Sequence, residues 1–157
     1  MPPGRVADWR TAVEAGHTEA PVPKANLPRS GNGHRPTLLL AEDHPKMARV
    51  LGELLAKDFD IVAIVADGER LIALAGQLHP VVIVADISLE GLDGLSATRV
   101  IRRRSPVVPL VLITANPDPE LRVAALAAGA SAFVRKVEAG SLVNVLNRLL
   151  HVEQGVE

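Results

Sequence analysis

The sequence predicts a doubly wound α/β domain, in which helices cover both faces of a five-stranded parallel sheet. Five short aliphatic runs alternate with five segments that carry apolar residues at helical spacing. Such alternation is typical of parallel strands joined by right-handed crossovers. The aliphatic runs contain no polar alternation, which indicates strands buried on both faces. The chain of 157 residues, 48% of them apolar, is long enough for one such core.

The first two strands and the helix between them follow from residues 37–66. Thr37–Ala41 is an aliphatic run that ends in Glu42 and Asp43. Pro45 suits the first position of a helix over 45–57. Residues 60–66 form the second buried run. The helix is indicated by apolar residues spaced i, i+3, i+4, i+7 and i+8, namely Met47, Val50, Leu51, Leu54 and Leu55.

The middle of the chain repeats the pattern. A helix carrying Leu71 and Leu78 precedes a third strand over 81–85, which ends in Asp86. A loop over 87–93 then leads into a helix over 94–104, where Arg102–Arg104 complement the negative end of the helix dipole.

The last third supplies two more strands and two more helices. The fourth strand covers 107–113, with Pro109 near its start, and ends in Thr114. The helix over 119–128 stops at Gly129, which suits a left-handed C-cap. The fifth strand covers 130–134 and leads to Lys136, and the final helix covers about 138–150.

Residues 1–36 differ in composition and are predicted to be a flexible extension to a domain over 37–157. They contain six of the twelve prolines and carry five Lys/Arg against three Asp/Glu. Such a composition buries little apolar surface. A short helix around Trp9–Glu14 is compatible with the pattern, and the alternative is a docking arm anchored by Trp9.

Composition excludes several classes of function. The absence of cysteine excludes disulfides, thiolate metal sites and a cysteine nucleophile, and fits a cytoplasmic protein. No apolar run reaches the length of a membrane span. The net charge of −1 lacks the basic footprint of a nucleic-acid binder, so we expect neither membrane nor direct nucleic-acid contact.

Polar side chains gather at the carboxyl ends of the predicted strands, where open α/β sheets carry their sites. If the first and third strands are neighbours, Glu42, Asp43 and Asp86 converge there, with Thr114 and Lys136 nearby. Crowded carboxylates repel each other, and a divalent cation would relieve the repulsion. Hard oxygen ligands favour Mg²⁺ over zinc.

This cluster has the parts that phosphoryl transfer to a carboxylate needs. Asp86 is the candidate nucleophile, which would become an aspartyl phosphate. Positive charge from Mg²⁺ and Lys136, with the hydroxyl of Thr114, would stabilise the charge spread over the phosphoryl oxygens.

At these residues the chain resembles the receiver domain of bacterial two-component response regulators. The matching segments are LLLAEDHP over 38–45, VADISLEGLDG over 84–94, LITA over 112–115 and GASAFVRK over 129–136. The resemblance covers residues 37–150 and implies a flavodoxin-like sheet with strand order 2-1-3-4-5.

The same resemblance assigns roles to residues. Asp86 would accept the phosphoryl group, and Thr114 and Lys136 would contact its oxygens. Glu42 and Asp43 would form an acidic pair at the Mg²⁺ site. The ligands of the ion would be the carboxylates of Asp43 and Asp86 and the backbone carbonyl of Ser88. Phe133 occupies the aromatic switch position.

Three positions depart from the family's usual residues. Glu90 stands four residues after the acceptor, and Val137 follows Lys136, where proline is frequent at both places. Phe133 replaces a frequent tyrosine and therefore has no hydroxyl to donate. None of these changes removes a group that the chemistry needs. They concern instead how phosphorylation is coupled to a change at the surface.

Three polar features near the site have plainer interpretations. We expect His44 to sit at a helix start and Arg102–Arg104 to end a helix, whereas Asn116 could tune the access of hydrolytic water. The aliphatic stretch 124–128 is expected to serve close packing.

No helix-turn-helix or catalytic segment follows the last predicted helix, so we expect a stand-alone receiver. The resemblance implies a signalling phosphoacceptor that assists its own phosphorylation and dephosphorylation and is not otherwise an enzyme. Its partners would be a sensor histidine kinase or histidine phosphotransfer protein and a downstream protein target, reached through the fourth helix, fifth strand and fifth helix. Apolar positions on the last helix could serve a homodimer.

Two alternatives remain. One is a degenerate receiver that acts as an interaction module without phosphorylation. The other is a haloacid-dehalogenase-like phosphatase, although its D-x-D motif would need an acid where Ser88 stands.

Overall fold

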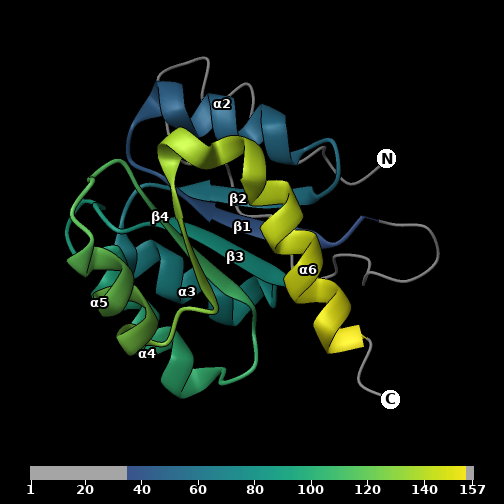
Figure 1. Ribbon diagram of the computed structural model, residues 1–157. Helices are drawn as coiled ribbons and strands as arrows, with labels where there is room; N and C mark the ends of the chain where they lie inside the picture. The colour runs from purple at the N-terminus through teal and green to yellow at the C-terminus, as the bar shows by residue number, and fades with distance from the viewer. Residues whose placement is uncertain (1–34, 155–157) are drawn as a thin grey trace.

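The protein, seen in a computed structural model, is described over residues 35–154. Its centre is a five-stranded parallel sheet with the strand order β2-β1-β3-β4-β5 (Figure 1). This confirms the fold class and the strand order that the sequence predicts. The strands are β1 (Thr37–Ala41), β2 (Asp60–Val65), β3 (Val82–Asp86), β4 (Leu110–Thr114) and β5 (Ala132–Arg135). The predictions for residues 1–34, including the helix near Trp9, lie outside the described residues.

Helices connect the strands, and three of them begin at a polar side-chain cap. They are α2 (Pro45–Leu55), α3 (Gly68–Leu78), α4 (Gly94–Arg104), α5 (Glu120–Ala128), the 3₁₀ helix η1 (Lys136–Ser141) and α6 (Leu142–Gln154). The side chains of His44, Asp67 and Asp93 cap α2, α3 and α4 by accepting backbone hydrogen bonds. Gly129 ends α5 with a φ of 109°, the left-handed C-cap that the sequence predicts.

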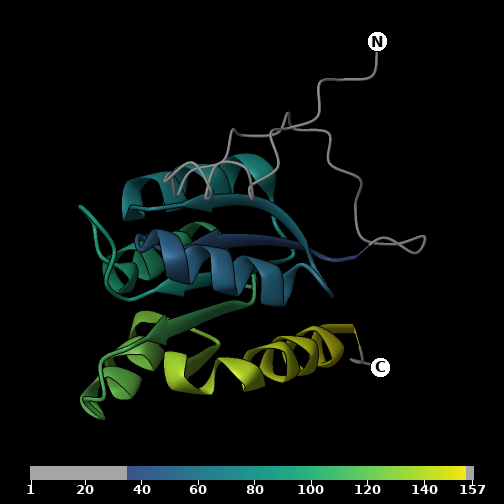
Figure 2. The ribbon, with the colours of Figure 1, turned by 90° about the horizontal axis from the view of Figure 1, so that it is seen from above.

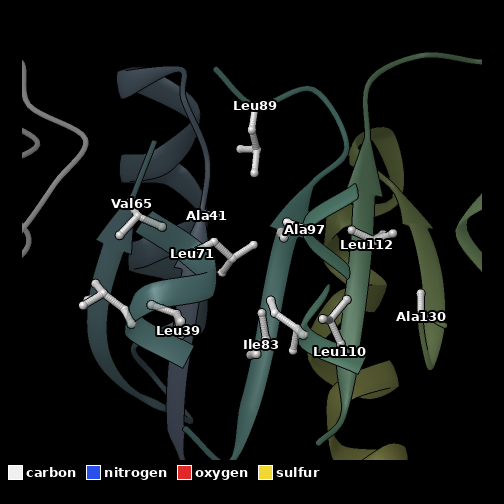
Figure 3. Close-up of a cluster of buried hydrophobic side chains, with 14 of the residues drawn as sticks. Leu39, Ala41, Val65, Leu71, Ile83, Leu89, Ala97, Leu110, Leu112 and Ala130 are labelled. Carbon is white, nitrogen blue, oxygen red and sulfur yellow. The ribbon is translucent and has the colours of Figure 1, made fainter. Parts of the chain in front are cut away.

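Two aliphatic layers lie on opposite faces of the sheet. On one face, β1 and β3 pack against Leu51 of α2 and Leu146 of α6. On the other, the sheet packs against α3, α4 and α5 through residues such as Leu71 and Ala97 (Figure 3). Figure 2 shows the strands lying between the teal helix α3 and the yellow helix α6. This two-sided burial is why the strands are continuously apolar.

The register of the sheet brings polar residues together at one edge. Ala41 of β1 pairs with Ala85 of β3, so Glu42 and Asp86 follow at equivalent positions. Asp86 pairs with Ile113 of β4, and Thr114 pairs with Arg135 of β5. Thr114 directly follows Ile113, and Lys136 directly follows Arg135. Both residues therefore lie at the same end of the sheet as the acidic residues.

The final helix begins later than the sequence predicts. Residues 136–141 form a 3₁₀ segment, and Glu138 within it has the non-helical angles φ −107° and ψ 23°. The Ser141 hydroxyl donates a 2.7 Å hydrogen bond to the Glu138 carbonyl oxygen. Gly140 also disfavours a regular helix here. The α-helix therefore starts at Leu142.

The fourth and fifth strands are shorter than predicted. β4 begins at Leu110 because Pro109 has no N–H to donate, although its carbonyl oxygen accepts a 2.9 Å hydrogen bond from Ile83 N. β5 begins at Ala132, after Ser131 N donates to the Leu110 carbonyl oxygen at 2.7 Å.

Among the helices of residues 35–154, none has the length and apolar character that crossing a bilayer requires.

Candidate functional site

Three carboxylates meet at the carboxyl ends of β1 and β3. Asp86 is the last residue of β3, while Glu42 and Asp43 follow β1 directly. One carboxylate oxygen from each of the three lies within 4.8 Å of the others. Glu42 is fully buried and Asp86 is 3% exposed, whereas Asp43 is half-buried. The convergence expected from the sequence is therefore present, at the point where the strand order reverses.

Lys136 places a positive charge between two of these carboxylates. Its Nζ donates a 2.6 Å hydrogen bond to Asp86 Oδ2. The same atom lies 2.6 Å from Glu42 Oε1. Glu42 Oε1 accepts no hydrogen bond within the described part of the chain, which indicates that this second approach is poorly aligned. The pairing is thus charge attraction at Glu42 and a directed hydrogen bond at Asp86.

The electrostatics of Glu42 reflect this crowding. Burial raises the pKa of Glu42 from 4.5 to about 7, the Lys136 ammonium opposes that rise, and the negative charge of Asp86 adds to it. Burial alone would lower the pKa of Lys136, but its hydrogen bond to Asp86 and the charge of Glu42 raise it overall. The cluster carries more negative charge than one ammonium compensates.

The loop after β3 is held in place by contacts at Ser88 and at residues that follow it. Ser88 N donates a 3.0 Å hydrogen bond to Asp86 Oδ1. Further along, Glu90 forms a parallel bridge with Asp67, and Leu92 N donates to Glu69 Oε2 at 3.3 Å. These contacts attach the β3–α4 loop to the start of α3.

Thr114 ends β4 beside the cluster and is 2% exposed. Its Oγ1 accepts a 3.0 Å hydrogen bond from Asn116 N, which leaves the hydroxyl proton available to another acceptor. The Asn116 side chain is exposed and accepts a 2.9 Å hydrogen bond from Asp118 N, so its carbonyl oxygen serves the turn.

Phe133 lies on β5, two strands away from Asp86 in the sheet order. It is half-buried and packs against the aliphatic layer shared by α3, α4 and α5. It also lines a cleft of about 270 Å³ with Pro119 and Arg122 of the α5 region and with Glu138 of η1. The ring therefore faces both the core and a solvent-accessible space.

Two polar predictions outside the cluster have clear outcomes. His44 caps α2, with Nδ1 accepting from Met47 N at 3.5 Å. Arg102 lies at the end of α4, as expected, and in addition donates to the carbonyl oxygens of Val108 and Gly129, both at 2.8 Å.

Sequence reasoning missed the role of Arg102 in joining the α4–β4 and α5–β5 loops, and it missed Glu69. Neither has a signal in a single sequence, because the partners lie up to 29 positions away along the chain.

The family model of the response regulator receiver domain matches residues 38–147. The probable transcriptional regulatory protein TcrX of Mycobacterium tuberculosis is 32% identical over 108 residues, which are 69% of this chain and 46% of TcrX. This chain therefore matches only about half the length of that relative.

Solved structures are similar in the same region. A two-component response regulator of the LuxR family from Aurantimonas sp. SI85-9A1 has a TM-score of 0.70 and 27% identity, covering 74% of this chain and 85% of its own. The receiver domain of the sensor histidine kinase PA1611 from Pseudomonas aeruginosa PAO1, solved with a magnesium ion in its active site cleft, has a TM-score of 0.67 and 31% identity. That likeness covers 73% of this chain and 97% of the PA1611 domain.

The sheet order, the acidic cluster at its switch point and a family match over residues 38–147 agree with one another. This chain belongs to the response regulator receiver domain family.

Proposed function

We propose that Asp86 accepts a phosphoryl group in a Mg²⁺-assisted transfer within a two-component phosphorelay. The observation that carries this proposal is the joint placement of three carboxylates within 4.8 Å and of Lys136 Nζ 2.6 Å from two of them. A carboxylate nucleophile with an adjacent ammonium and a cation site is suited to this chemistry.

Mg²⁺ fits the donor set, because hard carboxylate oxygens are its preferred ligands and the three acids repel one another without a cation. Asp43, Asp86 and the backbone carbonyl of Ser88 would hold the ion, with Glu42 beside them. When bound, Mg²⁺ would neutralise charge on the carboxylates and on the transferring phosphoryl oxygens.

The chain's own groups would act as follows. An Asp86 carboxylate oxygen forms a bond to phosphorus as the bond from phosphorus to the donor's imidazole nitrogen breaks, and the electron pair stays on that nitrogen. Lys136 moves its ammonium from Asp86 toward the phosphoryl oxygens, and Thr114 donates its hydroxyl proton to one of them. Both placements stabilise negative charge that develops in the transition state.

The donor would be a sensor histidine kinase or a histidine phosphotransfer protein, and the location would be the cytoplasm. The signal would pass to a protein target as a population shift, with Phe133 and the α5–β5–α6 face as the responding surface. Val123 and Leu126 on α5 support this choice, since they are 70% and 47% exposed. The apolar residues Leu142, Leu146 and Leu150 of α6 are buried in the core, so a homodimer would use other residues.

The test is phosphorylation by acetyl phosphate and Mg²⁺, followed by mass spectrometry and Phos-tag mobility. We expect one phosphoryl group on the native chain, none on Asp86→Asn, and none when EDTA removes Mg²⁺. Asp93→Asn is the matched control, because Asp93 lies in the same loop but caps α4, and this variant should still be phosphorylated.

Two results would contradict the proposal. A native chain that stays unmodified with acetyl phosphate and with phosphoramidate would favour the degenerate receiver. Multiple turnover of a phosphate ester would favour the phosphatase.

A further inference from the structure

A pocket of about 410 Å³ opens between α3 and α4, at the amino-terminal ends of β3 and β4. It lies at the opposite edge of the sheet from the acidic cluster. Ile72 and Ala75 of α3 and Ile101 of α4 give it an apolar lining, and Arg104 lies among its lining residues. Its volume falls within the range of about 300–1,000 Å³ that is usual for ligand pockets.

Two lining residues leave this pocket open. Gly76 lies inside α3, and a Cβ built there meets no atom within 4 Å. Glycine inside a helix is unfavourable relative to alanine and commonly marks a place where another group approaches the backbone. Val107 also lines the pocket, and it is 78% exposed, so apolar surface remains uncovered at its rim.

The chain enters the sheet at the same edge. Val81, which lines the pocket, donates its N–H to the Thr37 carbonyl oxygen at 3.1 Å and to Thr37 Oγ1 at 3.0 Å. Thr37 begins β1, so the chain enters the sheet at the end where the pocket opens. Arg35, two residues earlier, donates to the carbonyl oxygens of Ala56 and Lys57 at the end of α2. The covalent chain limits how far the preceding segment can lie from the pocket.

The preceding segment contains one large apolar anchor. Trp9 is the only tryptophan of the chain, and the two phenylalanines already pack in the domain, Phe59 in the core and Phe133 on β5. Val6, Trp9 and Val13 are spaced i, i+3 and i+7, a spacing that would place them on one face if the segment were helical. Trp9 and Thr37 are 28 positions apart, and a coil of that length spans about 30 Å, about the diameter of a small domain.

We propose that the segment around Trp9 docks in the α3–α4 pocket of its own chain, with the indole between Ile72, Gly76 and Ile101. A large aromatic side chain supplies much apolar contact area at little entropic cost. Tethering raises the effective concentration of the segment to about the millimolar range, so that even a weak contact is mostly formed. The proposal is independent of phosphorylation at Asp86.

Intrinsic fluorescence tests this directly in the full chain. The chain has one tryptophan and no tyrosine, so its indole emission reports Trp9 alone. In the folded native chain we expect emission at shorter wavelength than in the urea-unfolded chain, and acrylamide quenching reduced by about half or more, because most molecules are docked. Both values should stay constant on dilution of the protein, because the contact is intramolecular.

Filling the pocket should release the indole. Gly76→Leu places a side chain in the open space, and leucine is also the better helix former. We expect its emission and quenching to approach the unfolded values while far-ultraviolet circular dichroism shows a folded chain. Val107→Asp, which puts a charge on the exposed rim, should act in the same direction without touching the core.

Gly140→Leu is the matched control. A Cβ at Gly140 also meets no atom within 4 Å, but Gly140 lies in η1, away from the pocket. This variant should keep the native emission. The proposal is overturned by unfolded-like emission from the native chain, by a short-wavelength emission that Gly76→Leu and Val107→Asp leave unchanged, or by emission that depends on protein concentration.

Discussion

At the scale of single residues, Lys136 balances charges that would otherwise repel each other. Two carboxylates about 4 Å apart repel by roughly 1 kcal/mol in water-like surroundings and by about 4 kcal/mol at an effective dielectric constant of 20. Lys136 Nζ lies 2.6 Å from both Glu42 and Asp86, and its side chain is only 10% exposed. The ammonium is therefore part of the folded site as well as a candidate contact for the phosphoryl group.

Replacing Lys136 by methionine should destabilise the Mg²⁺-free protein, because a buried carboxylate pair then loses its counter-charge. Neutralising Asp86 as well should recover part of the loss. A double-mutant cycle of Lys136→Met and Asp86→Asn should give a coupling free energy of about 0.5–3 kcal/mol in urea unfolding. Additive effects of the two substitutions would contradict this account.

Glu42 is the residue for which the sequence was least informative. Its place after β1 predicts that it lies near Asp86, but a residue after a strand can equally face solvent. In the structure it is fully buried and paired with Lys136. The two residues are 94 positions apart in the chain. They meet because of the order of β1, β3, β4 and β5 in the sheet.

At the scale of elements, the start of α3 holds the loop that carries Ser88. A Cβ on Gly68, the first residue of α3, would lie 2.1 Å from the carbonyl oxygen of Leu92. Only a residue without a side chain allows this approach. The contact joins the β2–α3 and β3–α4 loops beside the acidic cluster.

Two glycines in α3 should therefore respond oppositely to alanine. Gly68→Ala should lower the free energy of unfolding by about 1–3 kcal/mol, because the Leu92 backbone must move. Gly76→Ala should raise it by about 0.5–1 kcal/mol, because the site is open and alanine favours helix. Urea denaturation of both variants measures the difference, and equal effects at the two positions would refute it.

Arg102 joins the ends of α4 and α5 to the start of β4. Besides its contacts with Val108 and Gly129, it donates to the carbonyl oxygens of Ser105 at 3.2 Å and Pro106 at 3.0 Å. These carbonyl groups belong to two connections, α4–β4 and α5–β5, that have no regular hydrogen-bond ladder. One guanidinium fork satisfies them together.

Substitution of Arg102 by alanine should cost about 2 kcal/mol of stability, because several backbone acceptors lose charged donors. Arg103→Ala is the matched control on the same turn. The Arg103 guanidinium makes a long 3.4 Å hydrogen bond to the Arg99 carbonyl oxygen on an exposed face, so its loss should cost less than about 0.5 kcal/mol. Thermal unfolding of the two variants would decide, and equal losses would contradict the assignment.

At the scale of the whole molecule, the stability of the domain is linked to the charge of its site. The folded state raises the pKa of Glu42 from 4.5 to about 7. Between these values the folded state binds a proton that the unfolded chain has released. Stability from this group is thus complete below pH 4.5 and is lost as the pH rises toward 7.

In Mg²⁺-free buffer, the free energy of unfolding should therefore fall with rising pH, by up to about 3 kcal/mol from this group. Saturating Mg²⁺ should flatten the fall, since the ion favours ionised carboxylates. Glu42→Gln should remove the pH dependence, and the exposed Glu53→Gln should keep it. Urea unfolding across this pH range is the measurement. A native chain whose stability rises toward pH 7 without Mg²⁺ would show that Glu42 is not the group responsible.

The pattern of residues along the chain was sufficient to predict the alternation of strands and helices and the residues at each strand end. Aliphatic runs without polar alternation require burial on both faces, and only a layered parallel sheet provides it. Local chemistry also indicated the helix start at Pro45 and the C-cap at Gly129. Asp86, the proposed phosphoacceptor, was predicted from its place at the end of the third run.

Three features follow only from the tertiary structure, namely the burial of Glu42, the contacts of Arg102 with distant loops and the pocket beside Gly76. Each depends on groups that are brought together across the fold, some from positions far apart in the chain. Their energies arise from packing and desolvation in three dimensions, which the spacing of residues along a single chain does not record.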